Sequence, residues 1–268
     1  MDRWRTPVRY AGRVVVVAGS TFAAVQVAKS RRGADLGALR RAEALATPDA
    51  LAATKTLPLS EALQPLAPGG ALQRGTTVGV SGSGGTTLAL ALGAAASAAG
   101  SWLAVAGVPA LGLAVAGEVG ICLQRLLLVA DPPAESWATV VAALLDAVDL
   151  VVASPPARLS GADARRLQAR ARERGAVLCT VGGVWPQPAD MRFTVTGAGW
   201  SGLTGAGSGC LEARRVEVSG GGRGAAARER RVSLWLPGPD GAVVAVTEPA
   251  VTEPAARPPV RTDLAVAG

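Results

Sequence analysis

A glycine-rich stretch between two apolar runs places the strongest constraint on the fold of this chain. Residues 79–86 have the spacing of a phosphate-binding loop, in which a glycine, four residues and a second glycine precede a lysine and a hydroxyl residue. Gly79 and Gly84 keep the two glycines and Thr86 keeps the hydroxyl, whereas Gly85 stands where the lysine belongs. A β-prone run enters the stretch and an apolar helical run leaves it. The sequence therefore predicts a sheet strand that turns directly into a helix.

The missing lysine limits what this loop can do. The ammonium of that lysine reaches the β- and γ-phosphates and offsets the charge that develops in phosphoryl transfer, which a glycine cannot do. Backbone N–H groups at a helix N-terminus still attract anions, so weak binding of ATP or ADP stays open while efficient hydrolysis is not expected. Alternatively, the glycines only allow a tight turn. The candidate residues of this vestigial phosphate loop are Gly79, Gly82, Ser83, Gly84, Gly85, Thr86 and Thr87.

The composition narrows the classes of function. The 268 residues are 49% hydrophobic, which predicts one main core rather than a disordered chain. The chain has no histidine, which excludes Ser-His triads and zinc sites that need histidine. The net charge of +7 comes almost entirely from arginine, because Lys29 and Lys55 are the two lysines. Arginine favours phosphate or acidic partners, although a basic surface can also serve solubility alone.

The cysteines predict neither a disulfide framework nor a metal site. Cys122, Cys179 and Cys210 are odd in number and far apart, which fits a reducing cytoplasm. We expect each of them to be a small core residue.

The first half of the chain contains two apolar stretches that need a structural interpretation. Residues 14–28 follow a basic opening and resemble a signal sequence in outline; we favour a strand over 14–18 with a short helix, and keep export or a start codon placed too early as alternatives. A helix is predicted over 35–46, docked on the core or on a partner, and a linker with one short helix over 47–75. The stretch 86–117 has no charged residue. Its glycines and prolines divide it into elements of globular length, so we expect no membrane span, with a membrane segment as the alternative.

Helices and strands alternate from the loop onward and then give way to strands. Such alternation predicts an α/β fold with a mostly parallel sheet flanked by helices, a C-terminal antiparallel hairpin and a disordered tail. The predicted helices are 87–99, 110–119, 135–147 and 161–174, and the predicted strands are 76–80, 102–106, 126–129, 150–153, 176–181, 192–196, 211–219 and 231–236. The predicted division is an N-terminal appendage and linker (1–56), a core (57–190), a β extension (191–238) and a tail (239–268).

Three stretches resemble the core of the RecA superfamily. They are Gly69-Gly70-Ala71-Leu72-Gln73-Arg74-Gly75 with the loop and helix start that follow, the run 120–129, and the run 147–154. The resemblance covers residues 57–185 and implies a RecA-like fold. In that family an acidic residue that polarises water follows the strand matching 102–106, and a carboxylate that supports Mg²⁺ closes the strand matching 150–153. Gly107 and Ser154 follow these two strands here, so the resemblance implies a pseudo-ATPase.

A second resemblance concerns one branch of that superfamily. The degenerate loop, the arginine-rich final hairpin and the alanine-rich composition resemble those of the ImuA-type proteins of actinobacteria. This resemblance implies a cytoplasmic, nucleoid-associated accessory factor of damage-induced mutagenesis, without catalytic activity, metal or required cofactor. Its implied partners are ImuB, an inactive Y-family polymerase homologue, and an error-prone replicative-type DNA polymerase.

DNA binding is the main rival function. Arginines of the predicted helix 161–174 and of the final hairpin could neutralise phosphates, or could be solvated and paired with local acids such as Asp163 and Glu173. Aromatic residues are too few for a base-stacking platform, and we expect Trp185, Trp200 and Trp235 to be core or interface anchors. A dinucleotide-binding fold is disfavoured because no acid ends the second strand. The candidate DNA or partner contacts are Arg214, Arg215, Arg223, Arg228, Arg230 and Arg231.

Overall fold

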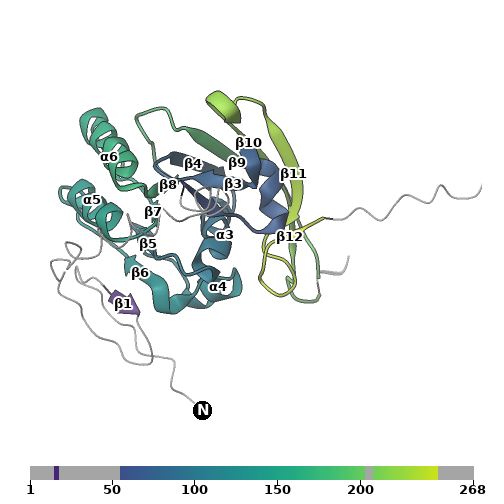
Figure 1. The fold of residues 1–268 in the computed structure, drawn as a ribbon. Helices are drawn as coiled ribbons and strands as arrows, with labels where there is room; N and C mark the ends of the chain where they lie inside the picture. Colours follow the sequence, from purple (N-terminus) through teal and green to yellow (C-terminus); the bar gives the residue numbers. More distant parts are fainter. Residues whose placement is uncertain (1–14, 18–54, 203–207, 247–268) are drawn as a thin grey trace, which may run out of the picture.

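A central sheet with helices on both faces forms the body of the protein. The computed structural model describes residues 15–17, 55–202 and 208–246 (Figure 1). Within those ranges, ten strands form one sheet in the order β1-β6-β5-β7-β8-β4-β9-β10-β11-β12. Their bounds are β1 (Val15–Val17), β4 (Thr77–Gly82), β5 (Leu103–Ala106), β6 (Leu126–Val129), β7 (Leu150–Ala153), β8 (Val177–Val181), β9 (Met191–Trp200), β10 (Arg214–Gly222), β11 (Arg230–Trp235) and β12 (Val244–Ala245).

The six strands from β6 to β9 in this order run parallel, and antiparallel strands extend the sheet on both sides. Strands β5, β7 and β8 are buried along their whole length, as expected of parallel strands covered on both faces. The predicted mostly parallel α/β fold is thereby confirmed. The order also speaks against the dinucleotide-binding alternative, because β4 and β5 are separated by β7 and β8, whereas the first two strands of that fold are neighbours.

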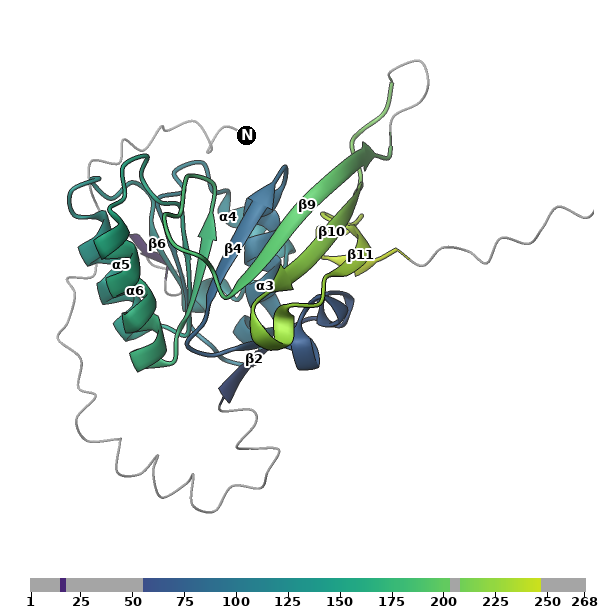
Figure 2. The same ribbon diagram turned by 90° about the horizontal axis from the view of Figure 1, so that it is seen from above.

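Two helical layers enclose the sheet. Helices α5 (Trp137–Ala147) and α6 (Gly161–Arg174) cover one face, with Trp137, Leu145 and Leu167 in the core beneath them. Helices α3 (Gly85–Ala98) and α4 (Leu113–Glu118) lie on the other face (Figures 1 and 2). The charge-free stretch 86–117 therefore folds as α3, β5 and the start of α4. Among the described residues, no helix is both long and apolar enough to cross a membrane.

The C-terminal strands form an antiparallel extension with one buried face. Strand β10 pairs with both β9 and β11, which confirms the predicted hairpin of the last two strands. Phe193, Val216, Val218 and Leu234 face the core on the side of α3. Strand β9 is longer than predicted and β10 begins and ends three residues later than predicted; both strands project beyond the end of β4 (Figure 2).

Two segments differ from the sequence predictions. The predicted linker contains a small two-stranded sheet, β2 (Thr56–Pro58) with β3 (Ala71–Gln73), joined by two 3-10 helices, Glu61–Leu66 and Pro68–Gly70. Their leucines are buried in the main core. The described structure also continues to residue 246, inside the range predicted as tail, because β12 pairs with β11. The predicted helix 35–46 and residues 247–268 lie outside the described ranges, whereas β1 falls inside the strand predicted over 14–18.

Candidate functional site

The glycine-rich loop has the predicted geometry of a strand that turns into a helix. Strand β4 ends at Gly82 and α3 begins at Gly85. Gly82 and Gly84 adopt φ angles of 91° and 84°, which are left-handed and favour glycine. The first backbone N–H with an acceptor in this turn is that of Leu88, which donates to the Gly84 carbonyl at 3.0 Å. The preceding N–H groups of the first turn are therefore available to an anion.

A cavity of about 310 Å³ lies inside this loop. Gly82, Gly84, Gly85 and Thr86 line it on the loop side, and Gly182 and Gly183 line it from the end of β8. No carboxylate and no cation is among its lining residues. The remaining predicted loop residues lie beside the cavity: Gly79 lines a neighbouring one, and Ser83 and Thr87 do not line it.

The backbone at the position of the missing lysine has room for a Cβ atom. A Cβ atom on Gly85 would meet Val80 Cγ1 at 3.5 Å, an ordinary van der Waals distance, and Gly85 does not have a positive φ. The backbone conformation at position 85 therefore does not require a glycine, and the cation is missing only because the sequence has no lysine there.

The position of the missing water-activating acid has no such room. Gly107 follows β5 with a φ of 74°, and a Cβ atom there would lie 2.7 Å from the Ser154 carbonyl oxygen and 3.2 Å from Trp137 Nε1. Ser154 itself follows β7, where a metal-supporting carboxylate would stand. The buried Trp137 occupies this space, and its Nε1 has no hydrogen-bond acceptor within the part of the chain that the structure describes. The described residues also contain no cluster of His, Cys, Asp or Glu side chains suited to a metal ion.

Arg214 braces the loop from the hairpin side. Only 7% of this residue is exposed, and its Nη2 donates to the carbonyl oxygen and to Oγ of Ser83, at 3.2 and 3.0 Å. Its guanidinium also lies 5.9 Å from the ring centre of Trp200, within reach of a cation-π interaction. The prediction of Arg214 as a DNA or partner contact is thus corrected, because the residue is buried against the loop. The signal was present in the sequence: Arg214 has the same strand parity as Val216 and Val218, which face the core.

The other predicted contact residues are spread along the hairpin surface. Arg215 and Arg223 are exposed, and Arg231 pairs with Glu229 at 3.1 Å. Arg230 Nη1 donates to the Arg228 carbonyl at 3.0 Å. These arginines surround the final strands without converging on the loop cavity.

The arginines of α6 are mostly structural. Arg170 and Arg174 both bind Asp146 on α5, at 2.6 and 3.0 Å from their Nε atoms, and Arg172 lies 3.8 Å from Asp190. Arg166 pairs with Asp163 and Arg170 with Glu173, as predicted. The partner Asp146 was not predicted because it lies on another helix.

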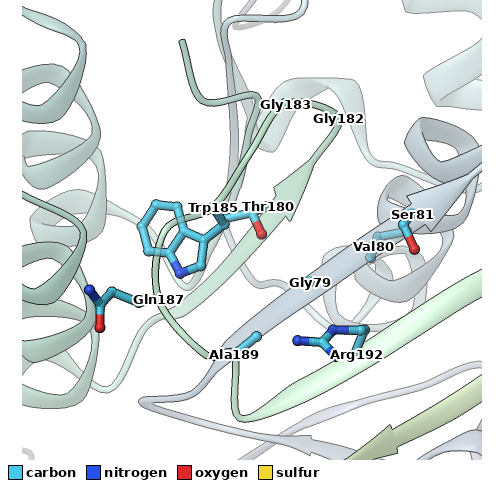
Figure 3. Close-up of a pocket in the computed structure, with 10 residues that line it drawn as sticks. All are labelled: Gly79, Val80, Ser81, Thr180, Gly182, Gly183, Trp185, Gln187, Ala189 and Arg192. Carbon is cyan, nitrogen blue, oxygen red and sulfur yellow. The ribbon is translucent and has the colours of Figure 1, made fainter. Parts of the chain in front are cut away.

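Sequence reasoning missed a second cavity next to the loop cavity. It measures about 190 Å³ and is lined by Ser81, Thr180, Trp185, Gln187 and Arg192, together with a glycine of β4 and the two glycines that follow β8 (Figure 3). The two cavities share Val80, Ser81, Gly182 and Gly183. Arg192 stands alone in the sequence rather than in a basic run, so no pattern drew attention to it.

The strand order, the helical layers and the degenerate phosphate loop define a RecA-like α/β protein. Comparison with solved structures supports this fold: the RadB recombinase superposes with a TM-score of 0.52 over 70% of this chain and 97% of the recombinase chain, at 16% identity. Residues 65–187 match the family described as MT3502 N-terminal domain. The chain is 36% identical, over 154 residues, to the uncharacterized protein Rv3395c of Mycobacterium tuberculosis, covering 55% of this chain and 74% of that protein. The chain belongs to the family of this mycobacterial protein.

Proposed function

We propose that this protein is a non-catalytic RecA-like accessory factor of DNA-damage-induced translesion mutagenesis. In this proposal it acts in the cytoplasm, at the nucleoid, through contacts with an inactive Y-family polymerase homologue and an error-prone replicative-type polymerase. The observation that carries the non-catalytic part is the loss of charge at three separate positions, Gly85, Gly107 and Ser154. The choice of mutagenesis rests on the resemblance to ImuA-type proteins of actinobacteria.

The three positions support a scaffold role because they serve different steps of hydrolysis. Phosphoryl transfer needs a cation on the phosphates, an oriented water and a supported metal ion. Gly85 supplies no cation, and Ser154 supplies no carboxylate. Gly107 supplies no acid and has a backbone that resists one. A single lost group could be replaced from a partner subunit, whereas the loss of all three favours a protein that works through its surfaces.

The test is co-purification of the full chain with the inactive Y-family homologue, run beside an ATP turnover assay. We expect a stoichiometric complex without added nucleotide and no turnover above background. ATP turnover at an ordinary enzymatic rate, on the order of 1 per second or more, would refute the non-catalytic part. Failure of the chain to co-purify with the homologue would refute the proposed partner.

A second candidate is a DNA-binding repair or recombination protein with residual nucleotide binding. It is favoured by the preserved loop cavity at the N-terminus of α3 and by the exposed hairpin arginines. Retention of a short single-stranded DNA at physiological salt, strengthened by ATP, would support this candidate over the scaffold.

A further inference from the structure

One face of the C-terminal strands is left open by the described helices. Alternate residues of β9, β10 and β11 point away from the core on this face, and Thr196, Arg215, Glu217 and Arg231 are exposed there. Ser81 Oγ and Thr194 Oγ1, 3.2 Å apart, continue the same polar face onto β4. This face is hydrogen-bonding and charged rather than apolar, so burial against a hydrophobic surface would not suit it.

A groove of about 390 Å³ runs across this face and joins the cavity of Figure 3. The two share Ala189 and Arg192, so Arg192 stands at their junction (Figure 3). Gly220, Gly221 and Gly222 contribute to the lining of the groove, opposite the loop of Pro188 and Ala189. A Cβ atom on Gly221 would meet no atom within 4 Å, which shows how open the groove is above this glycine.

The groove has an excess of positive charge. Arg192 and Arg223 both line it, and neither has an ion pair with another described residue. Glu229, which also lines the groove, is already paired with Arg231 at 3.1 Å. Two guanidinium groups in one groove, whose one lining carboxylate is already paired with another arginine, favour an anionic ligand.

The adjoining cavity offers a place for one side chain of such a ligand. Trp185 contributes to its lining, and the Nε1 of Trp185 is buried without an acceptor among the described residues. Thr180 Oγ1 makes only a long hydrogen bond, 3.4 Å from the Val78 carbonyl. Arg192 and the Thr180 hydroxyl both line this cavity and suit a carboxylate or amide oxygen.

We propose that the groove and the cavity bind an extended acidic segment of a protein partner. Arg192 and Arg223 would pair with carboxylates of this segment, and one of its side chains would enter the cavity of Figure 3. The inference deepens the proposed scaffold function, on which its biological setting rests, by naming the chemistry of one contact.

The observations favour a peptide over a nucleic acid. Glu217 and Glu229 lie on the same face. A peptide can place neutral residues opposite them, whereas every nucleotide of a continuous backbone carries a phosphate. Trp185 is the one aromatic residue among those that line the groove and the cavity, whereas single-stranded nucleic acids stack successive bases on several aromatic side chains.

The experiment measures binding of three fluorescent probes to the full chain by anisotropy. They are a peptide of about ten residues rich in Glu and Asp, a peptide with Gln and Asn in place of the acids, and a single-stranded DNA of about ten nucleotides. We expect the acidic peptide to bind best and the neutral one to bind weakly. The double variant Arg192→Glu with Arg223→Glu should weaken acidic-peptide binding roughly tenfold or more.

The matched control is the double variant Arg158→Glu with Arg166→Glu, which makes the same charge change at two exposed arginines that line neither the groove nor the cavity. It should change the affinity by less than about twofold, because neither residue lines the groove or the cavity and exposed charges are screened by salt. Equal losses in both variants would reduce the effect to net charge and overturn the proposal, as would failure of the acidic peptide to bind. Tighter binding of the DNA, lost in the double variant, would reassign the groove to nucleic acid. No polymerase is present in this assay, so its failure is distinct from failure of the co-purification.

Discussion

At the scale of single residues, the loop needs a glycine at position 82. A Cβ atom on Gly82 would overlap the backbone carbonyl of Val195, and the φ of 91° is strained for any side chain. We expect Gly82→Ala to lower the free energy of unfolding by at least about 2 kcal/mol. The control is Gly221→Ala, where a Cβ meets nothing and the change should stay within about 0.5 kcal/mol. Denaturant titration measures the free energy of unfolding of both variants. A loss for Gly82→Ala as small as that for Gly221→Ala would show that the loop tolerates a side chain at position 82.

The cysteines show where residue-scale prediction succeeds and fails. All three were expected in the core, but only Cys179 is buried, while Cys122 is half-buried and Cys210 is exposed. A cysteine carries no signal that separates a strand interior from an irregular segment such as the one before β10. Burial raises the pKa of the Cys179 thiol to about 12. We therefore expect alkylation of the native protein at pH 8 to modify Cys210 and to spare Cys179, which mass spectrometry of digests checks. Rapid native labelling of Cys179 would contradict its burial.

At the scale of elements, Arg214 connects the hairpin to the phosphate loop. Replacement by leucine would leave the Ser83 carbonyl without this donor and remove the cation beside Trp200. We expect Arg214→Leu to lower the free energy of unfolding by about 1–3 kcal/mol and to change the tryptophan emission. Arg228→Leu, an exposed hairpin position, is the control and should have little effect. A fully stable Arg214→Leu protein with unchanged emission would show that the brace is dispensable.

Helices α5 and α6 are joined by a second connection between elements, centred on Asp146. The hydrogen bond from Arg170 holds the pKa of this carboxyl below its usual value, with further help from Arg174. The unfolded chain binds the proton more readily, so the contribution is complete above the unfolded pKa and is lost as pH falls through the folded value. Since a third of the Asp146 side chain is exposed, the contribution should be no more than about 1 kcal/mol. The difference in stability between the wild type and Asp146→Asn should be constant from about pH 5 to 8 and shrink below about pH 4. Glu173→Gln is the control, and a difference that grows in acid would contradict this sign.

At the scale of the whole molecule, the sequence predicted what local patterns encode. The buried strands and the loop were placed to within a few residues, because apolar runs and glycine spacing are local signals. The small sheet of β2 and β3, the length of β9 and the strand β12 were missed, because each depends on pairing with a distant partner. The cavity of Figure 3 was missed for the same reason, since β4, β8 and β9 lie far apart along the chain and meet only in the fold.

The packing of distant strands also decides which of the missing catalytic groups a substitution could restore. A lysine at position 85 fits the backbone, whereas an acid at position 107 would collide with Ser154. We expect Gly85→Lys to strengthen binding of ATP, seen as a larger nucleotide-induced rise in melting temperature, because the new ammonium reaches the phosphates. Gly85→Gln, similar in length but neutral, should not do so. ATP turnover should remain at background in both variants, because the acids that would orient water and support a metal ion are still missing after β5 and β7, where Gly107 and Ser154 stand. Hydrolysis restored by Gly85→Lys alone would mean that another part of the chain supplies those groups, and the non-catalytic assignment would fall.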